Sequence, residues 1–213
     1  PLLIGMTIVS LGTSAPEIVV SLMASLAGSG ELAVGNALGS NITNVGLVLG
    51  VTLIIRAIAI DVSATKRELP QMLIATLLAG ALMADGSLCA TDGALLLAGL
   101  VLFLVFLARR SEPKTSQTTE PPALPVSKAW GVFTVGLVLL ILSSRALVFG
   151  AVNIATALGV SELVIGLTIV AIGTSLPELA ASVMSALKGH ADIAVGAIVG
   201  SNVFNLLVVL AIP

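Results

Sequence analysis

Long hydrophobic runs separated by short polar connections cover most of this 213-residue sequence. Crossing a bilayer core takes roughly 20 apolar residues in a helix. The runs that approach this length are 2–27, 33–55, 69–86, 93–108, 129–150, 162–187 and 193–212. They are continuously apolar rather than alternating, which favours helices over the strands of a membrane barrel. The pattern predicts an all-α membrane protein with seven spans.

The polar connection at residues 109–128 stands apart because it combines charged residues, serines, threonines and four prolines. This composition is typical of a flexible linker. The linker divides the chain into a first half at 1–108, with four predicted spans, and a second half at 129–213, with three.

The composition further limits the kinds of protein that this chain can be. Hydrophobic residues make up 57% of the chain and charged residues 9%, and the mean hydropathy is +1.17, which excludes an ordinary soluble domain. The net charge of −2 and the lack of a dense basic tract argue against nucleic acid as a partner. Cys89 is the only cysteine, so neither an intrachain disulfide nor a multi-cysteine metal cluster can form.

Successive loops must alternate between the two sides of the membrane, and all basic residues but Arg145, inside the fifth run, then fall on one side. They are Arg56, Lys66, Arg67, Arg109, Arg110, Lys114, Lys128 and Lys188. The positive-inside rule makes this side cytoplasmic, the linker included, in a bacterial-type inner (plasma) membrane. The opposite loops carry acids that are either ordinary solvated residues or a weak attractor of cations, namely Glu31, Asp85, Asp92 and Glu162.

An internal repeat relates residues 5–44 to residues 166–205 at a shift of 161 positions without a gap, and twenty of the forty positions are identical. The copies begin five crossings apart, so they run through the membrane in opposite directions. Such inverted repeats are a recurrent plan of secondary transporters. Completing the symmetry would add one helix before Pro1 and two after Pro213, so we expect the sequence to be a fragment with seven of ten helices.

The motifs GTSAPE (12–17) and GTSLPE (173–178) place Glu17 and Glu178 inside otherwise uncharged spans. An ionised group there costs several kcal/mol unless it is paired or hydrated. Neither motif contains a basic residue, so a mobile cation is the simplest counter-charge. Uptake of a proton by the glutamates is the alternative.

Each motif also carries a proline, Pro16 or Pro177, which cannot donate a backbone hydrogen bond and predicts a broken helix. Backbone carbonyls at such a break are hard oxygen ligands. Hydroxyls three and four positions before each glutamate share its helical face: Thr13, Ser14, Thr174 and Ser175. The alternative is a proline kink whose hydroxyls satisfy the helix backbone, although a kink does not explain the glutamates.

The second motif pair, GNALGSNITN (35–44) and GAIVGSNVFN (196–205), begins with glycines four residues apart, which let two helices approach closely. Serine and the last asparagine of each motif then share one helical face. These residues are Ser40, Asn44, Ser201 and Asn205. We assign Asn44 and Asn205 to the site, and expect Asn41 and Asn202 to cap or bridge helix backbone.

All these groups offer oxygen, which favours hard cations over soft transition metals. Two carboxylates balance one divalent or two monovalent ions, so calcium and sodium would exclude each other. Flexible oxygen ligands also suit calcium better than magnesium. Mutual exclusion combined with alternating access is a physical basis for exchange.

The two motif pairs resemble the alpha-repeats of the calcium/cation antiporter superfamily, especially its bacterial and archaeal sodium/calcium exchanger-like members. The resemblance implies a ten-helix inverted-repeat fold in which Glu17 and Glu178 bind both calcium and sodium. It further implies ligands at Thr13, Ser14, Thr174, Ser175, Ser40, Asn44 and Ser201, and backbone carbonyl ligands at Ser10 and Ala171. Asn205 is a departure, since some relatives, including potassium-dependent exchangers, have Asp there; potassium coupling is therefore not expected.

The predicted function is secondary active exchange of calcium for sodium at a midplane site, with the transported ions and the lipid bilayer as partners and no further cofactor. A proton-coupled calcium antiporter is the nearest alternative. A cation channel is another, although two inverted binding halves argue against it. The spans hold no nucleophile with its base and no aspartate pair, so we do not expect an enzyme.

Overall fold

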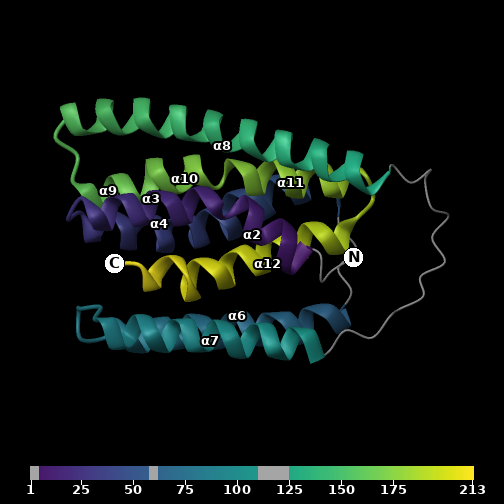
Figure 1. The fold of residues 1–213 in the computed structure, drawn as a ribbon, viewed down its shortest axis with the longest axis horizontal. Coiled ribbons are helices and arrows are strands. Elements are labelled where there is room, and N and C mark those ends of the chain that lie inside the picture. The colour runs from purple at the N-terminus through teal and green to yellow at the C-terminus, as the bar shows by residue number, and fades with distance from the viewer. Residues whose placement is uncertain (1–4, 58–61, 110–124) are drawn as a thin grey trace.

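The computed structural model describes residues 5–57, 62–109 and 125–213, and within these ranges it contains helices and no strand (Figure 1). The first half comprises η1 (Gly5–Val9), α2 (Ser10–Thr13), α3 (Ala15–Leu26), α4 (Gly30–Thr43), η2 (Asn44–Leu49), α5 (Gly50–Ile55), α6 (Val62–Leu82) and α7 (Ala90–Arg109). The second half comprises α8 (Val126–Ala157), α9 (Glu162–Ile165), η3 (Gly166–Val170), α10 (Ala171–Thr174), α11 (Leu176–Leu187), α12 (Ala191–Leu207) and η4 (Val209–Ala211). The expectation of an all-α fold is confirmed.

The two copies of the repeat fold alike. In each, a π-helical segment (η1 or η3) leads into one α-helical turn (α2 or α10), and the helix is then interrupted at a serine before a longer helix begins. The interruption falls at Ser14, with φ −79° and ψ 4°, and at Ser175, with φ −83° and ψ 4°. Pro16 and Pro177 lie in the first turn of the helices that follow, where a missing N–H is tolerated. The break predicted from each proline is therefore present, and in the first copy the two parts bend by 44°.

Close helix crossing brings the two repeats together. A Cβ added to Gly39 on α4 would lie 2.5 Å from the backbone oxygen of Leu167 on η3. A Cβ on Gly35 would lie 3.0 Å from the oxygen of Leu163, and one on Gly166 would lie 2.7 Å from the oxygen of Leu32. Only glycine permits this contact of backbone against backbone, as the spacing of Gly35 and Gly39 predicted. Their counterparts Gly196 and Gly200 are buried on α12, which packs against η1.

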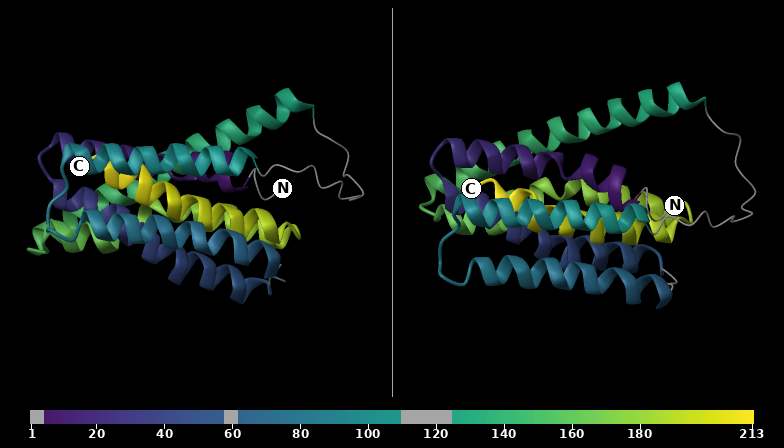
Figure 2. Two further views of the ribbon diagram at one scale, coloured as in Figure 1. Left: turned by 90° about the horizontal axis from the view of Figure 1, so that it is seen from below. Right: turned by 60° about the horizontal axis from the view of Figure 1, so that its bottom comes forward.

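The remaining helices surround this centre. Helices α6 and α7 form a hairpin beside α12, and α8 runs along the opposite side of the bundle (Figures 1 and 2). Leu96, Val203 and Leu207, from α7 and α12, belong to the hydrophobic cluster on the hairpin side. The span Ala191–Ala211, which begins with α12, is the most enclosed of the described candidate spans, with 83% of its most apolar stretch buried. A hydrophobic helix buried all round belongs at the middle of a membrane bundle.

Among the described residues, length and composition identify four helices that can cross a membrane, and five if the bent pair Thr7–Thr13 and Ala15–Leu26 counts as one span. The other four are Gly30–Ile55, Ala90–Arg109, Leu163–Leu187 and Ala191–Ala211. The predicted spans 69–86 and 129–150 correspond to shorter apolar parts of α6 and α8, at Leu69–Leu82 and Ser127–Ser143. Seven spans therefore stays a prediction.

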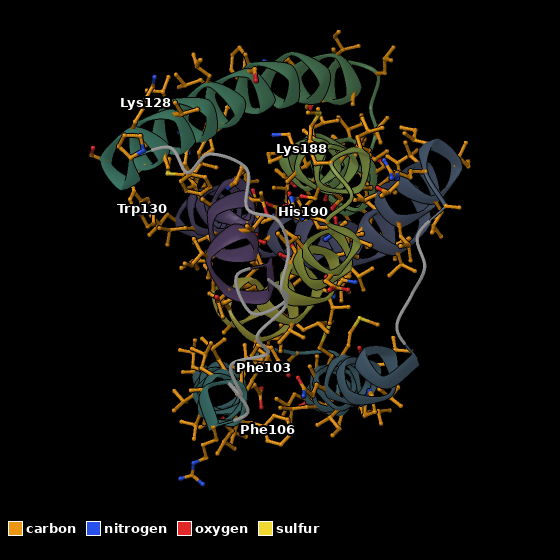
Figure 3. The ribbon with its side chains drawn as sticks, turned by 90° about the vertical axis from the view of Figure 1, so that its right-hand side faces the viewer. Phe103, Phe106, Lys128, Trp130, Lys188 and His190 are labelled. Atoms are coloured by element: carbon orange, nitrogen blue, oxygen red, sulfur yellow. The ribbon has the colours of Figure 1, made fainter. Side chains whose placement is uncertain are left out.

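Three basic residues of the predicted cytoplasmic side share one end of the bundle. Lys128, near the start of α8, and Lys188, between α11 and α12, lie at the end that faces the viewer in Figure 3. Arg56 reaches the same end, because its Nη1 donates to the backbone oxygen of Leu187 at 2.8 Å. Most of the predicted linker, residues 110–124, lies outside the described residues, so its location stays a prediction.

Candidate cation-binding site

Glu17 and Glu178 lie in the first turns of α3 and α11, directly after the two helix interruptions, and both side chains are 0% exposed. Their positions follow from the repeat. In each copy the helix is interrupted at a serine, and the first turn of the next helix contains a proline followed by the glutamate. A helix N-terminus also favours a negative side chain. The inverted arrangement thus directs two carboxylates from opposite repeats toward one buried region.

Each repeat supplies a hydroxyl to the glutamate of the other. Ser14 Oγ donates to Glu178 Oε1 at 3.1 Å, and Ser175 Oγ donates to Glu17 Oε1 at 3.4 Å. Ser201 Oγ adds a third bond, to Glu178 Oε1, at 2.8 Å, and lies 2.6 Å from Ser14 Oγ. The five side chains therefore share one region to which both copies contribute.

The second carboxylate oxygens have no such contacts. Glu17 Oε2 and Glu178 Oε2 are buried, and neither has a hydrogen-bond partner among the residues that the structure describes. Hydroxyls are the side-chain partners of the first oxygens, and no basic side chain bonds to either glutamate within the described ranges. Arg145, the basic residue inside the fifth hydrophobic run, is exposed on α8. Buried ionised carboxylates without a cationic partner are costly, so either a bound cation or a proton would stabilise this arrangement.

The threonines and the remaining hydroxyls lie around the glutamates. Thr174 Oγ1 lies 3.3 Å from Ser40 Oγ, which joins the two repeats again. The backbone oxygens of Ser10 and Ala171 each accept a hydroxyl hydrogen bond, from Thr13 at 3.4 Å and from Thr174 at 3.3 Å. Each carbonyl has a second lone pair for another partner. Every one of these residues is buried.

The asparagines form a second polar group. Asn44 Nδ2 donates to Asn202 Oδ1 at 3.1 Å, and Asn202 Nδ2 lies 3.6 Å from the sulfur of Met72 on α6. Asn202 was expected to serve helix backbone, but its amide bonds two side chains instead. Asn44 Oδ1 and both polar atoms of Asn205 are buried without a partner in the described part of the chain. Asn41 is only partly buried, and its Oδ1 is also unpaired there.

One buried polar residue next to the site, Asn36, was missed. Its amide donates to the backbone oxygen of Glu17 at 3.2 Å and to Ser21 Oγ at 2.9 Å, and its Oδ1 accepts from Thr174 Oγ1 at 3.1 Å. Comparison of the two repeats hides Asn36, because its counterpart is Ala197. The available signal was an amide in an apolar helix beside the closely packed Gly35.

The chemistry of the whole group is uniform. Carboxylate, hydroxyl, amide and carbonyl oxygens are present, while the described residues contain no group of three or more His, Cys, Asp or Glu side chains suited to a resident metal. Such a set fits hard, exchangeable cations with flexible coordination better than a tightly held transition metal.

Comparison with known proteins identifies the family. The family described as sodium/calcium exchanger protein matches residues 1–109 and 128–213. This chain belongs to the sodium/calcium exchanger family. CaxA of Alkalimonas amylolytica, a candidate antiporter by its name, is 50% identical over 220 residues, which cover 100% of this chain and 69% of CaxA. Inner membrane protein YrbG of Escherichia coli K12 is 44% identical over 225 residues, covering 100% of this chain and 69% of YrbG.

Solved structures agree with this family. A structure of the sodium-calcium exchanger NCX_Mj soaked with 10 mM Na⁺ and no Ca²⁺ superposes with a TM-score of 0.79 at 33% identity. The match covers 99% of this chain and 70% of that one. This exchanger-family chain therefore has the transporter fold that its inverted repeat predicted, and its family is one of membrane cation antiporters, not a family of catalytic enzymes.

Proposed function

We propose that this exchanger-family chain carries the ion site of a secondary antiporter that exchanges calcium for sodium by alternating access. The observation that supports this most directly is a pair of buried oxygens, Glu17 Oε2 and Glu178 Oε2, which have no hydrogen-bond partner among the described residues. They belong to glutamates whose other oxygens are bonded crosswise between the two inverted repeats. A site built equally from both repeats opens to either side of the membrane when one repeat moves against the other.

The proposed ligands are the two carboxylates and the oxygens around them. They are Glu17, Glu178, Thr13, Ser14, Thr174, Ser175, Ser40, Asn44, Ser201 and Asn205, with the backbone oxygens of Ser10 and Ala171. Two carboxylates neutralise one Ca²⁺ or two Na⁺. The two loads therefore compete, and competition for one site couples their fluxes.

Competition between calcium and sodium for one site also agrees with the names of related proteins. NCX_Mj is called a sodium-calcium exchanger, and the solved structures include soaks with sodium, calcium and strontium. Strontium is, like calcium, a large divalent ion suited to flexible oxygen ligands. We propose calcium and sodium as the transported ions of this chain as well. We also place the chain in an inner membrane, with residues 109–128 on the cytoplasmic side.

The proposal is tested by calcium flux in proteoliposomes that contain the full-length protein. An imposed sodium gradient should drive calcium uptake, whereas a pH gradient alone should not. Uptake driven only by the pH gradient would replace sodium by protons as the coupling ion. Calcium flux that needs neither counter-ion gradient would indicate a channel, and both results contradict the proposal.

Substitution of the glutamates adds a second test of the same site. Glu17→Gln and Glu178→Gln each remove one charge while keeping the size of the side chain, so each should abolish sodium-driven calcium uptake. Glu31→Gln is the matched control, because Glu31 is exposed at the start of α4. Unchanged calcium binding in both Glu17→Gln and Glu178→Gln would contradict the site assignment.

A further inference from the structure

Asn36 connects three elements around the glutamates. It lies on α4, is 0% exposed, and bonds Glu17 and Ser21 on α3 as well as Thr174 on α10. An asparagine amide has two N–H donors and one oxygen acceptor. Both donors and the acceptor are used here, so the side chain is held in one orientation.

Asn36 is also an acceptor for the hydroxyl proton of Thr174. That hydroxyl has a single proton and several acceptors in reach, which include the Glu17 carboxylate, Asn36 Oδ1 at 3.1 Å, the backbone oxygen of Ala171 at 3.3 Å and Ser40 Oγ at 3.3 Å. Of the three distances, the one to Asn36 is the shortest. When the proton is donated to Asn36, the lone pairs of Thr174 Oγ1 remain available for a cation.

The second repeat has no asparagine in the corresponding position, so Thr13 of the first repeat has no such partner among the described residues. The counterpart of Asn36 is Ala197, whose backbone oxygen accepts from Ser10 Oγ at 3.0 Å. The counterpart of Ser21 is Ser182, whose buried hydroxyl has no partner within the described residues, whereas Ser21 accepts a bond from Asn36. The two halves of the site are therefore similar in ligand type but different in how firmly their threonines are held.

We propose that Asn36 is a positioning residue that orients the Thr174 hydroxyl and the Glu17 backbone for cation binding, and so favours calcium over sodium. The inference rests on the proposed function. Ion–dipole attraction grows in proportion to the charge of the ion. A lone pair held toward the site therefore stabilises Ca²⁺ about twice as strongly as Na⁺ of similar size.

The test measures the half-saturating concentrations of calcium and sodium in proteoliposomes that contain the full-length protein. Loss of an outer residue that orients a ligand typically weakens metal affinity about tenfold or more. Asn36→Ala should thus raise the half-saturating calcium concentration about tenfold, and that of sodium by only about the square root of this factor, or threefold. A purely structural defect would lower the maximal rate and the melting temperature while leaving the ratio of the two concentrations unchanged.

A double substitution tests whether Asn36 acts through Thr174. In a Thr174→Ala background, Asn36→Ala should change the calcium concentration by much less than tenfold, because the hydroxyl that it orients is gone. Asn36→Leu, which keeps the branched shape of the side chain but removes its polar atoms, repeats the test if Asn36→Ala folds poorly. Asn153→Ala is the matched control, since Asn153 is exposed on α8 and bonds only the backbone of Phe149 in the described contacts.

The outcomes separate this inference from the proposed function. If the unsubstituted protein shows sodium-driven calcium uptake but both Asn36 variants keep its calcium-to-sodium ratio, the positioning role is wrong and the proposed function stands. A full tenfold loss in the Thr174→Ala background also overturns the role. If the unsubstituted protein shows no sodium-driven uptake, the proposed function fails first, and calcium binding alone then decides whether Asn36 positions a cation ligand.

Discussion

Ser14 Oγ donates to Glu178 Oε1 at 3.1 Å, although the two residues are 164 positions apart and belong to different repeats. The opposite pair, Ser175 and Glu17, repeats the contact at 3.4 Å. Each glutamate therefore accepts a hydrogen bond from the repeat that does not contain it, and Glu178 accepts a further one from Ser201 of its own repeat. A movement of one repeat against the other must change both contacts together, which links the geometry of the site to the conformation of the whole bundle.

A double-mutant cycle on Ser14 and Ser201 should reveal strong coupling. Both hydroxyls bond Glu178 Oε1, and they lie 2.6 Å from each other. A hydrogen bond to a charged group contributes about 1.5–3 kcal/mol. Ser14→Ala and Ser201→Ala should each weaken calcium binding, and the double variant should differ from the sum of the singles by about 0.5–3 kcal/mol.

Isothermal titration of calcium into the purified full-length protein measures this coupling. Thr76→Ala serves as the control partner for Ser14→Ala, because Thr76 is exposed on α6 and bonds the backbone oxygen of Met72. That control pair should be additive. Additive effects of Ser14→Ala and Ser201→Ala would show that the two hydroxyls act independently.

Substitution of Gly39 should destabilise the protein through the helix crossing. An added Cβ would meet the backbone oxygen of Leu167 at 2.5 Å and the Cβ of Ala171 at 2.7 Å. Overpacking of this kind costs about 1–3 kcal/mol. Gly39→Ala should therefore lower the melting temperature in detergent, whereas Gly46→Ala should not, since a Cβ there meets nothing within 4 Å. Equal melting temperatures for the two variants would contradict the close crossing.

Much of the site was predictable because the repeat encodes it twice. Identical residues at a shift of 161 positions pointed to Glu17, Glu178 and the serines that bond them, and the structure brings these side chains together. Helical periodicity and the prolines also predicted the interruption in each span. These features are local or symmetric, so a single sequence is enough to find them.

The remaining features depend on differences between the repeats or on contacts across the bundle. Asn36 was missed because Ala197 replaces it in the second copy. The partner of Asn202 was missed because helical spacing gives the face on which a residue lies, but not the side chain of the other repeat that it meets across the bundle. The contact of Asn202 with Met72 joins helices that are distant in sequence, which periodicity cannot predict.

Asn202→Ala should weaken cation binding by releasing Asn44. The substitution removes the acceptor of Asn44 Nδ2 and leaves a buried donor unpaired, which costs about 1–3 kcal/mol. The Asn44 amide can then turn away from the orientation that it has beside the site. We expect a lower melting temperature and a higher half-saturating calcium concentration in the same transport assay.

Met72→Leu is the matched control for Asn202→Ala. It removes only the 3.6 Å contact between sulfur and amide, a weak interaction, and keeps the bond between Asn44 and Asn202. Calcium affinity should therefore stay close to that of the unsubstituted protein. A larger loss with Met72→Leu than with Asn202→Ala would show that the α6 contact, and not the paired asparagines, controls the site.

Cys89 offers a direct measurement of membrane orientation. It is exposed in the connection between α6 and α7, at the end of the bundle opposite the turn that holds Lys188 (Figures 1 and 3). The distribution of basic residues predicts that this connection faces outward. A membrane-impermeant maleimide added to intact spheroplasts should therefore label Cys89.

The control variant combines Cys89→Ser with Lys188→Cys, and it should be labelled only after permeabilisation. Because the Cys89 thiol contacts Asp92 Oδ2 at 2.9 Å, labelling in permeabilised cells provides the reference for its reactivity. The reverse labelling pattern would invert the predicted topology and place residues 109–128 outside the cytoplasm.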